Sequence, residues 1–259
     1  MAYQTLLTSL ENGIFTITIN RPDKLNALNR DVMHDLDEVM NEVYNNAAIR
    51  SVIITGAGPK SFVAGADISE FIGLSGEEGK LLAKKGQDIF FKIENAPKPV
   101  VACINGFALG GGCELAMSCH FRIAAENAKF GQPEVNLGLI PGYGGTQRLT
   151  QLIGKGRSLE LLMSAGMIDA KTALQYGLVN YVVPQEELLG KAISILEIIN
   201  SKAPLAIAGC ITTANAVFDE SNNGFEVERN EFAKCFGTED MKEGTSAFLE
   251  KRKAVFQGK

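Results

Sequence analysis

The first half of the chain holds short apolar runs separated by one clear helical period. Residues 13–19 alternate apolar side chains with threonine, which predicts a strand with one buried face. Ser51–Gly56 and Val100–Ile104 are continuous apolar runs, typical of strands covered on both faces. Apolar residues recur at helical spacing over residues 32–44, where Asn29 or Asp31 can cap the predicted helix. Further elements are predicted as a helix at 82–93, a helix after residues 110–112 and a strand at 121–124.

After Gly145 the pattern becomes mostly helical. One strand-like segment interrupts it at residues 178–183, and amphipathic helices are predicted over 204–218, 225–236 and 241–256. These last helices carry many large apolar residues for their length, which indicates packing against the core or another subunit. The sequence therefore predicts an α/β protein, with a core of repeated strand–strand–helix units over residues 1–200 and a C-terminal helical region over 201–259.

Two glutamates stand in otherwise apolar or glycine-rich surroundings. Glu114 follows three glycines at the start of an apolar helix, and Glu134 follows Pro133, which fixes the backbone before it. A buried carboxylate is costly unless it is paired or hydrogen-bonded, and charged residues are rarely buried without such partners. The two glutamates therefore indicate a site that moves protons beside backbone N–H groups.

Glycine-rich turns accompany both glutamates. Gly110, Gly111 and Gly112 lie between a strand and a helix, where free N–H groups at the positive helix end can hold a developing oxyanion. A dinucleotide-binding turn is disfavoured because G-x-G-x-x-G is not matched, whereas a packing turn with a structural Glu114 remains an alternative. Small residues at 64–66 let a ligand approach the backbone, or form a tight turn capped by Asp67. Residues 142–145 lead into a helix whose first N–H groups are expected to be free.

Composition excludes several classes of function. A net charge of −5 disfavours binding to nucleic acid. His34 and His120 are too few for a zinc site, so no metal is expected. Both histidines lie outside the motifs, which disfavours a Ser–His–Asp hydrolase. Five cysteines without a C-x-x-C pair predict buried, reduced thiols. No signal peptide or membrane span is recognisable, so we expect a cytoplasmic location and no membrane partner.

Taken together, the motifs resemble the crotonase (enoyl-CoA hydratase/isomerase) superfamily over essentially the whole chain. The resemblance rests on the segments at 19–22, 25–28, 64–67, 108–116, 130–134 and 247–252. It implies a right-handed spiral of ββα units followed by a trimerising helical region, assembled as a homo-hexamer built from two trimers.

The resemblance also implies roles for particular residues. Ala66 and Gly111 match the two oxyanion-hole donors of the family, and Glu114 and Glu134 match its two hydratase glutamates. The substrate would be a trans-2-enoyl-CoA, with Glu114 as general base, Glu134 as the acid that protonates C2, and no cofactor beyond the coenzyme A of the substrate. The implied substrate-binding positions are Lys24, Leu25, Ala27, Ala64, Asp67, Ile68, Pro133, Gly142, Phe248 and Lys251, the last two reaching a neighbouring subunit's coenzyme A.

Two departures from the family pattern stand out. Ser69 replaces a lysine that is frequent in hydratases, so Lys24 or Lys251 would have to supply the charge opposite a phosphate. Tyr143 stands where a small residue is frequent and would narrow the acyl pocket. The basic end of the last helix at 246–253 either complements the helix dipole or contacts phosphate. Isomerisation of enoyl-CoA, dehydration of a 3-hydroxyacyl-CoA, and a non-catalytic acyl-CoA- or RNA-binding member remain alternative functions.

Overall fold

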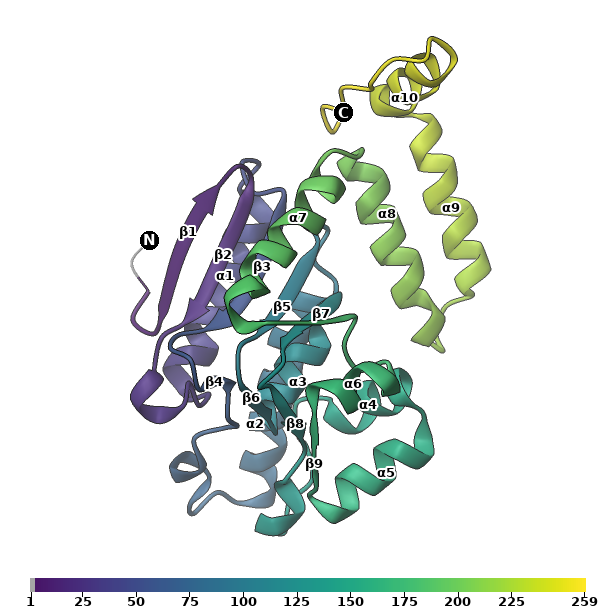
Figure 1. The fold of residues 1–259 in the computed structure, drawn as a ribbon. Coiled ribbons are helices and arrows are strands. Elements are labelled where there is room, and N and C mark those ends of the chain that lie inside the picture. The colour runs from purple at the N-terminus through teal and green to yellow at the C-terminus, as the bar shows by residue number, and fades with distance from the viewer. Residues whose placement is uncertain (1–2) are drawn as a thin grey trace.

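The computed structural model describes residues 3–259, and its fold is built around two β-sheets (Figure 1). The larger sheet has the order β1-β2-β3-β5-β7-β10, and only its β1–β2 pair is antiparallel. Its strands are β1 Leu6–Glu11, β2 Ile14–Ile19, β3 Ser51–Gly56, β5 Val100–Ile104, β7 Phe121–Ala125 and β10 Tyr181–Val183. The smaller sheet, of order β4-β6-β8-β9, consists of β4 Ser61–Val63, β6 Phe107–Leu109, β8 Lys129–Gly131 and β9 Met167–Asp169.

Three successive units of the chain repeat the same path. Each unit places a first strand in the larger sheet and a second in the smaller sheet, and then continues into a helix: β3–β4–α2, β5–β6–α3 and β7–β8–α4. The helices are α2 Gly76–Glu94, α3 Gly111–Ser118 and α4 Gly145–Ile153, and short 3-10 turns η2 Ile68–Phe71 and η3 Glu134–Leu137 precede α2 and α4. The predicted spiral of ββα units is therefore confirmed.

The core fills both faces of the larger sheet. On one face, side chains of the sheet pack with α1 Arg30–Asn45, α2 and α3. On the other face, α7 Leu188–Asn200 places Leu188, Ala192 and Leu196 against Ile53 and Val101. Helices α5 Lys155–Ser164 and α6 Ala170–Tyr176 lie beside the smaller sheet (Figure 1). The continuous apolar pattern of β3 and β5 follows from this burial on both sides.

The boundaries of the helices and strands agree with the sequence prediction only in part. Asn29 caps α1 by accepting from the Val32 N–H at 3.0 Å, as one of the two expected caps. Helix α2 begins at Gly76, six residues before the predicted start, because a capping box between Ser75 and Glu78 initiates a polar, exposed first turn. The strand predicted at 178–183 is limited to Tyr181–Val183.

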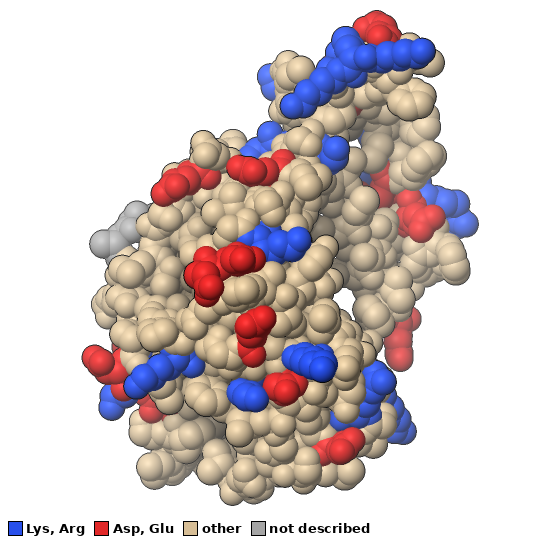
Figure 2. All heavy atoms as spheres, in the orientation of Figure 1, with Lys and Arg blue, Asp and Glu red and all other residues tan. Residues whose placement is uncertain are grey.

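The last three helices form an arm that extends away from the two sheets (Figure 1). The arm consists of α8 Pro204–Asn215, α9 Gly224–Phe236 and α10 Glu239–Leu249. Helix α10 ends before the predicted residue 256, because Lys251 turns into the left-handed region (φ +57°) and Arg252 folds back onto Glu243. In Figure 2, basic side chains gather at the tip of the arm, and charges of both signs are interspersed elsewhere on this face.

The arm exposes large apolar side chains. Phe225, Phe232, Phe236 and Phe248 all lie on its surface, and Phe248 is 83% exposed. No single helix among residues 3–259 is long and apolar enough to span a membrane; one pair, Gln185–Asn200 with Pro204–Phe218, passes by length and composition only and is bent by 109°. Of the cysteines predicted to be buried, Cys103, Cys113 and Cys119 are, whereas Cys210 on α8 is exposed.

Candidate active site

A cleft of about 770 Å³ lies where the three ββα units meet. It is bounded by the segment between β4 and α2, the start of α3, η3 and the loop before α4. Both glutamates singled out in the sequence line this cleft, together with Ala66 and Gly111. The spiral thus brings together groups that are far apart in the chain.

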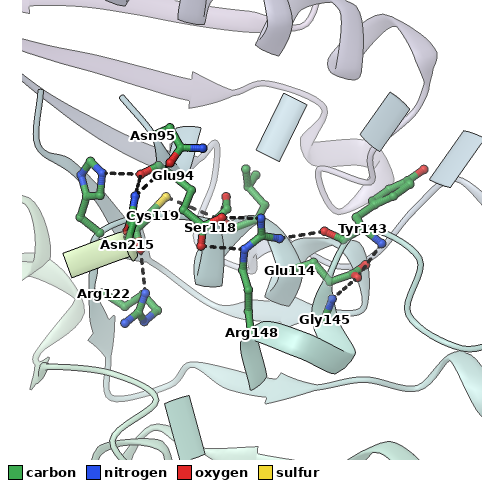
Figure 3. Close-up of polar contacts among 12 residues, drawn as sticks. Glu94, Asn95, Glu114, Ser118, Cys119, Arg122, Tyr143, Gly145, Arg148 and Asn215 are labelled. Atoms are coloured by element: carbon green, nitrogen blue, oxygen red, sulfur yellow. Dashed lines mark hydrogen bonds and ion pairs between the residues drawn. The ribbon is translucent and has the colours of Figure 1, made fainter. Parts of the chain in front are cut away.

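Glu114 is buried, with only 2% of its surface exposed, and its position is fixed by two backbone donors. The N–H groups of Tyr143 and Gly145 donate to its Oε1 at 2.8 and 2.7 Å (Figure 3). The Oε2 atom has no hydrogen-bond partner among residues 3–259. The sequence predicted free N–H groups at the start of α4; this is wrong for Gly145, whose N–H is occupied by Glu114.

Burial raises the pKa of Glu114 to about 7. The two N–H donors and the Arg148 guanidinium oppose this change, and the neighbouring Glu134 carboxyl adds to it. Desolvation therefore outweighs the favourable contacts, so protonated and ionised forms are both populated near neutral pH. A carboxyl group with a pKa near 7 can accept and release a proton readily at neutral pH.

Glu134 begins η3 and is partly buried. The Gln132 amide, oriented so that its nitrogen faces the carboxylate, donates to Oε1 and Oε2 of Glu134 at 3.0 and 3.2 Å. Burial again raises the pKa of Glu134. Gly110 allows the close approach of the backbone, because its φ is +49° and a Cβ atom there would lie 2.8 Å from Glu134 Oε1.

Two backbone N–H groups at the cleft lack acceptors. Ala66 is held by its neighbours, because the Leu28 N–H donates to the Gly65 carbonyl at 2.9 Å and the Asp67 N–H donates to the Leu28 carbonyl at 2.7 Å. Gly111 starts α3 close by, and a Cβ atom on it would lie 3.7 Å from Ala66 N. Within the part of the chain that is described, no oxygen accepts from the N–H of Ala66 or Gly111. The pair can therefore receive an oxyanion.

Four of the predicted substrate-binding residues line the cleft and six do not. Those at the cleft are Ala64, Ile68, Pro133 and Gly142. Lys24, Leu25 and Ala27 lie on the adjoining segment, where the Leu25 carbonyl accepts from the Ala64 N–H at 3.0 Å. The Asp67 carboxylate is held by Arg21 at 3.3 Å and by Ser69 at 2.7 Å rather than lining the cleft. Phe248 lies near the end of α10 and Lys251 just after it, and neither lines the cleft.

Sequence reasoning missed part of the site. Gln132 and Arg148 were not singled out. The apolar wall of the cleft is formed by Leu82, Ala83, Leu137, Leu139 and Ile140, and the sequence indicated it only broadly, as residues 71–82 and the neighbourhood of Tyr143. Tyr143 does line the cleft, but only 8% of the residue is exposed. Its ring packs against Gly86 and edge-on against Phe90, with 5.6 Å between the ring centres. The signal for Arg148 was its place just after the 142–145 glycine cluster.

Burial of Glu114 should make the stability of the protein depend on pH. The folded-state pKa of Glu114 lies above the ordinary value of 4.5, so the unfolded chain releases this proton at a lower pH than the folded protein. The free energy of unfolding should therefore decrease as pH rises from 4.5 to 7, by about 3 kcal/mol in all. The Glu114→Gln variant, whose amide oxygen can still accept both N–H bonds, should avoid this loss. Urea unfolding at pH 5 and pH 8 should show its advantage over wild type growing with pH. A difference equal at the two pH values would contradict the argument.

Comparison with known proteins places this chain in a family. Residues 9–259 match the family model described as enoyl-CoA hydratase/isomerase. The chain belongs to the enoyl-CoA hydratase/isomerase family. A member from Syntrophomonas wolfei, named crotonyl-CoA hydratase, is 48% identical over all of both chains. A short-chain-enoyl-CoA hydratase from Clostridium acetobutylicum is 46% identical, over 98% of this chain and 97% of its own.

Solved structures of the family agree with the fold. The enoyl-CoA hydratase from Bacillus anthracis superposes with a TM-score of 0.93 at 38% identity, covering 99% of this chain and all of its own. A family structure from Geobacillus kaustophilus gives a TM-score of 0.95 at 31% identity, covering 100% of this chain and 98% of its own. The resemblance noted in the sequence is therefore confirmed for family and fold.

Proposed function

We propose that this protein is a short-chain enoyl-CoA hydratase that reversibly adds water to trans-2-enoyl-CoA to give 3-hydroxyacyl-CoA. The observation that carries the proposal is that one cleft contains two glutamates with raised pKa values and two backbone N–H groups without acceptors. The names of the relatives at 46% and 48% identity support the same reaction.

In the proposed mechanism, the thioester carbonyl oxygen accepts from the N–H groups of Ala66 and Gly111. This contact stabilises the negative charge that develops as water attacks C3. Glu114 takes a proton from that water through Oε2 while the new C3–O bond forms. Glu134, in its protonated form, gives a proton to C2, and the two carboxyl groups then exchange the proton with solvent. Gly142 lines the cleft, and we propose that its N–H orients the water.

No cofactor is needed for this chemistry, because the thioester itself activates C2 and C3. Among residues 3–259, no group of three His, Cys, Asp or Glu side chains is arranged to hold a metal ion. The proposed reactants are the acyl-CoA substrate and water.

We further propose where coenzyme A lies. The segment of Lys24, Leu25 and Ala27 adjoins the cleft wall made by Ala64 and Ile68, so the nucleotide would run along it. Phe248, near the end of α10, and Lys251, just after it, would contact the coenzyme A of a neighbouring subunit, since the arm extends away from the two sheets (Figure 1). The exposed aromatic residues of the arm support a homo-hexamer built from two trimers, in which other copies cover them. A cytoplasmic location remains a prediction.

The proposed function is tested by following the loss of enoyl-thioester absorbance with crotonyl-CoA. We expect rapid turnover, a product that has gained one water, and a rate that decreases for longer acyl chains. The same assay at varied pH should show activity decreasing as pH falls through about 7, where Glu114 becomes protonated. Binding of coenzyme A without turnover would overturn the proposal, and 3-enoyl and branched thioesters would then test for the isomerase alternative.

A further inference from the structure

The loop of residues 142–145 holds the catalytic carboxylate through two separate peptide groups. The Tyr143 N–H belongs to the peptide bond between residues 142 and 143, and the Gly145 N–H belongs to the peptide bond between residues 144 and 145. Both donate to the same oxygen of Glu114. The peptide between them, which carries the Tyr143 carbonyl, therefore sets the direction of both donors. Gly144 adopts φ +105°, a conformation that allows this sharp turn.

Arg148 fixes that central peptide. Its Nη1 donates to the Tyr143 carbonyl at 2.9 Å, and a Cβ atom on Gly144 would lie 2.4 Å from the same nitrogen (Figure 3). Arg148 is 4% exposed, and its guanidinium lies over the Phe91 ring at 5.0 Å. The side chain thus fills the space directly behind the loop, on α4.

A bidentate ion pair holds the guanidinium in this place. Arg148 Nε donates to Glu94 Oε1 at 3.1 Å, and Nη2 donates to Oε2 at 2.8 Å. This leaves Nη1 for the loop carbonyl, a division that the planar guanidinium fork permits and a lysine ammonium does not.

Glu94 is itself anchored from two other elements. Its backbone carbonyl accepts from Asn215 Nδ2 of α8 at 2.8 Å. The same carbonyl oxygen accepts from His120 Nε2 at 3.1 Å. Nε2 must carry the ring proton, because His120 Nδ1 accepts from the Val100 N–H at 2.8 Å. The C-terminal end of α2 is therefore held in place where the Glu94 carboxylate binds Arg148.

We propose that Arg148 is a positioning residue for Glu114, which through the Tyr143 carbonyl aims two backbone N–H groups at the catalytic carboxylate. The inference rests on the proposed hydratase function for its kinetic consequence, but its geometric basis does not depend on it. Arg148 itself does not line the cleft. It acts on Glu114 through the loop of residues 142–145.

The groups that act on the charge of Glu114 come from every side of it. They are Glu134 on η3, Arg148 on α4, the Tyr143 phenol and the neighbouring Cys113 thiol on α3. Of these, Glu134 disfavours the carboxylate and Arg148 favours it. Loosening the loop would remove N–H donors from the ionised form, so the pKa of Glu114 would rise.

The test compares Arg148→Lys with Arg122→Lys, because both variants keep the charge. Arg122 is a matched control: it is 5% exposed and donates to the carbonyls of Leu178 and Cys119 at 2.6 and 2.8 Å, away from the loop. Arg148→Lys should lower kcat for crotonyl-CoA by about 10- to 100-fold with KM within about twofold, as expected for a misplaced catalytic group. The acidic limb of its pH profile should move up by about one pH unit. Arg122→Lys should change neither.

A second readout does not require activity. The Glu114 carboxyl can be titrated by infrared difference spectroscopy, with Glu114→Gln used to assign its band, and Arg148→Lys should raise its midpoint. If wild type fails to hydrate crotonyl-CoA, the proposed function fails while this titration still decides the inference. A lower melting temperature for Arg148→Lys, with kcat and both pH midpoints unmoved, would show a purely structural role and overturn it.

Discussion

Hydration of crotonyl-CoA by the Glu114→Gln variant is expected to fall by about 10³- to 10⁴-fold in kcat. The amide oxygen can still accept the N–H groups of Tyr143 and Gly145, so the loop should stay in place. An amide cannot take the proton of the attacking water, however, so the proposed general base is lost. The measurement is the initial rate of absorbance loss at saturating crotonyl-CoA, with KM expected to change little.

Two companion variants make this result specific. Glu160→Gln removes an exposed carboxylate on α5 and should leave the rate unchanged. Glu134→Gln should also lose most of the activity, because C2 then lacks its proton donor. If Glu114→Gln retained more than about a tenth of the wild-type rate, Glu114 could not be the general base.

The Gly112→Ala variant is expected to lose both stability and activity. A Cβ atom at this position would lie 2.0 Å from the Val63 carbonyl oxygen and 2.7 Å from the Val63 Cβ atom. Because α3 must move away from β4 to relieve this overlap, we expect a cost of about 2–4 kcal/mol in the free energy of unfolding. The same shift separates the Gly111 N–H from Ala66, which should lower kcat by about 10²-fold. Urea unfolding and crotonyl-CoA kinetics, at one protein concentration, measure the two effects.

Gly190→Ala is the matched control for this prediction. Gly190 lies within helix α7, and nothing within 4 Å would meet an added Cβ atom. Alanine there should stabilise the protein by about 0.5–1 kcal/mol and leave kcat unchanged. Equal behaviour of the two variants would mean that the contact between α3 and Val63 does not control the site.

Two features of the candidate site stand out in the sequence because each conflicts with its surroundings, whereas Ala66 was assigned only through the family resemblance. Glu114 is a charged residue in an apolar helix, and Gly110 to Gly112 place flexible backbone where a strand meets a helix. The strands β3 and β5 were predicted with their observed bounds because burial on both faces leaves a continuous apolar run. These signals are all contained in a few consecutive residues.

What the sequence did not reveal depends on contacts between distant segments. Nothing near Tyr143 indicates that its N–H donates to a carboxylate 29 residues earlier in the chain. Arg148 was passed over because its partner Glu94 lies 54 residues away. The short strands β4, β6 and β8 carry only three residues each, too few for a periodic pattern.

The spiral has a consequence for how the protein folds. Its first unit supplies Ala66, its second supplies Gly111 and Glu114, and its third supplies Glu134, so no segment contains the whole site. Contacts between distant segments form slowly, because closing a long loop costs conformational entropy before the contact stabilises the protein. During refolding, recovery of helix content should therefore run ahead of recovery of turnover. Regained activity would report that all three units have closed, which makes the reaction itself a probe of the last step in folding.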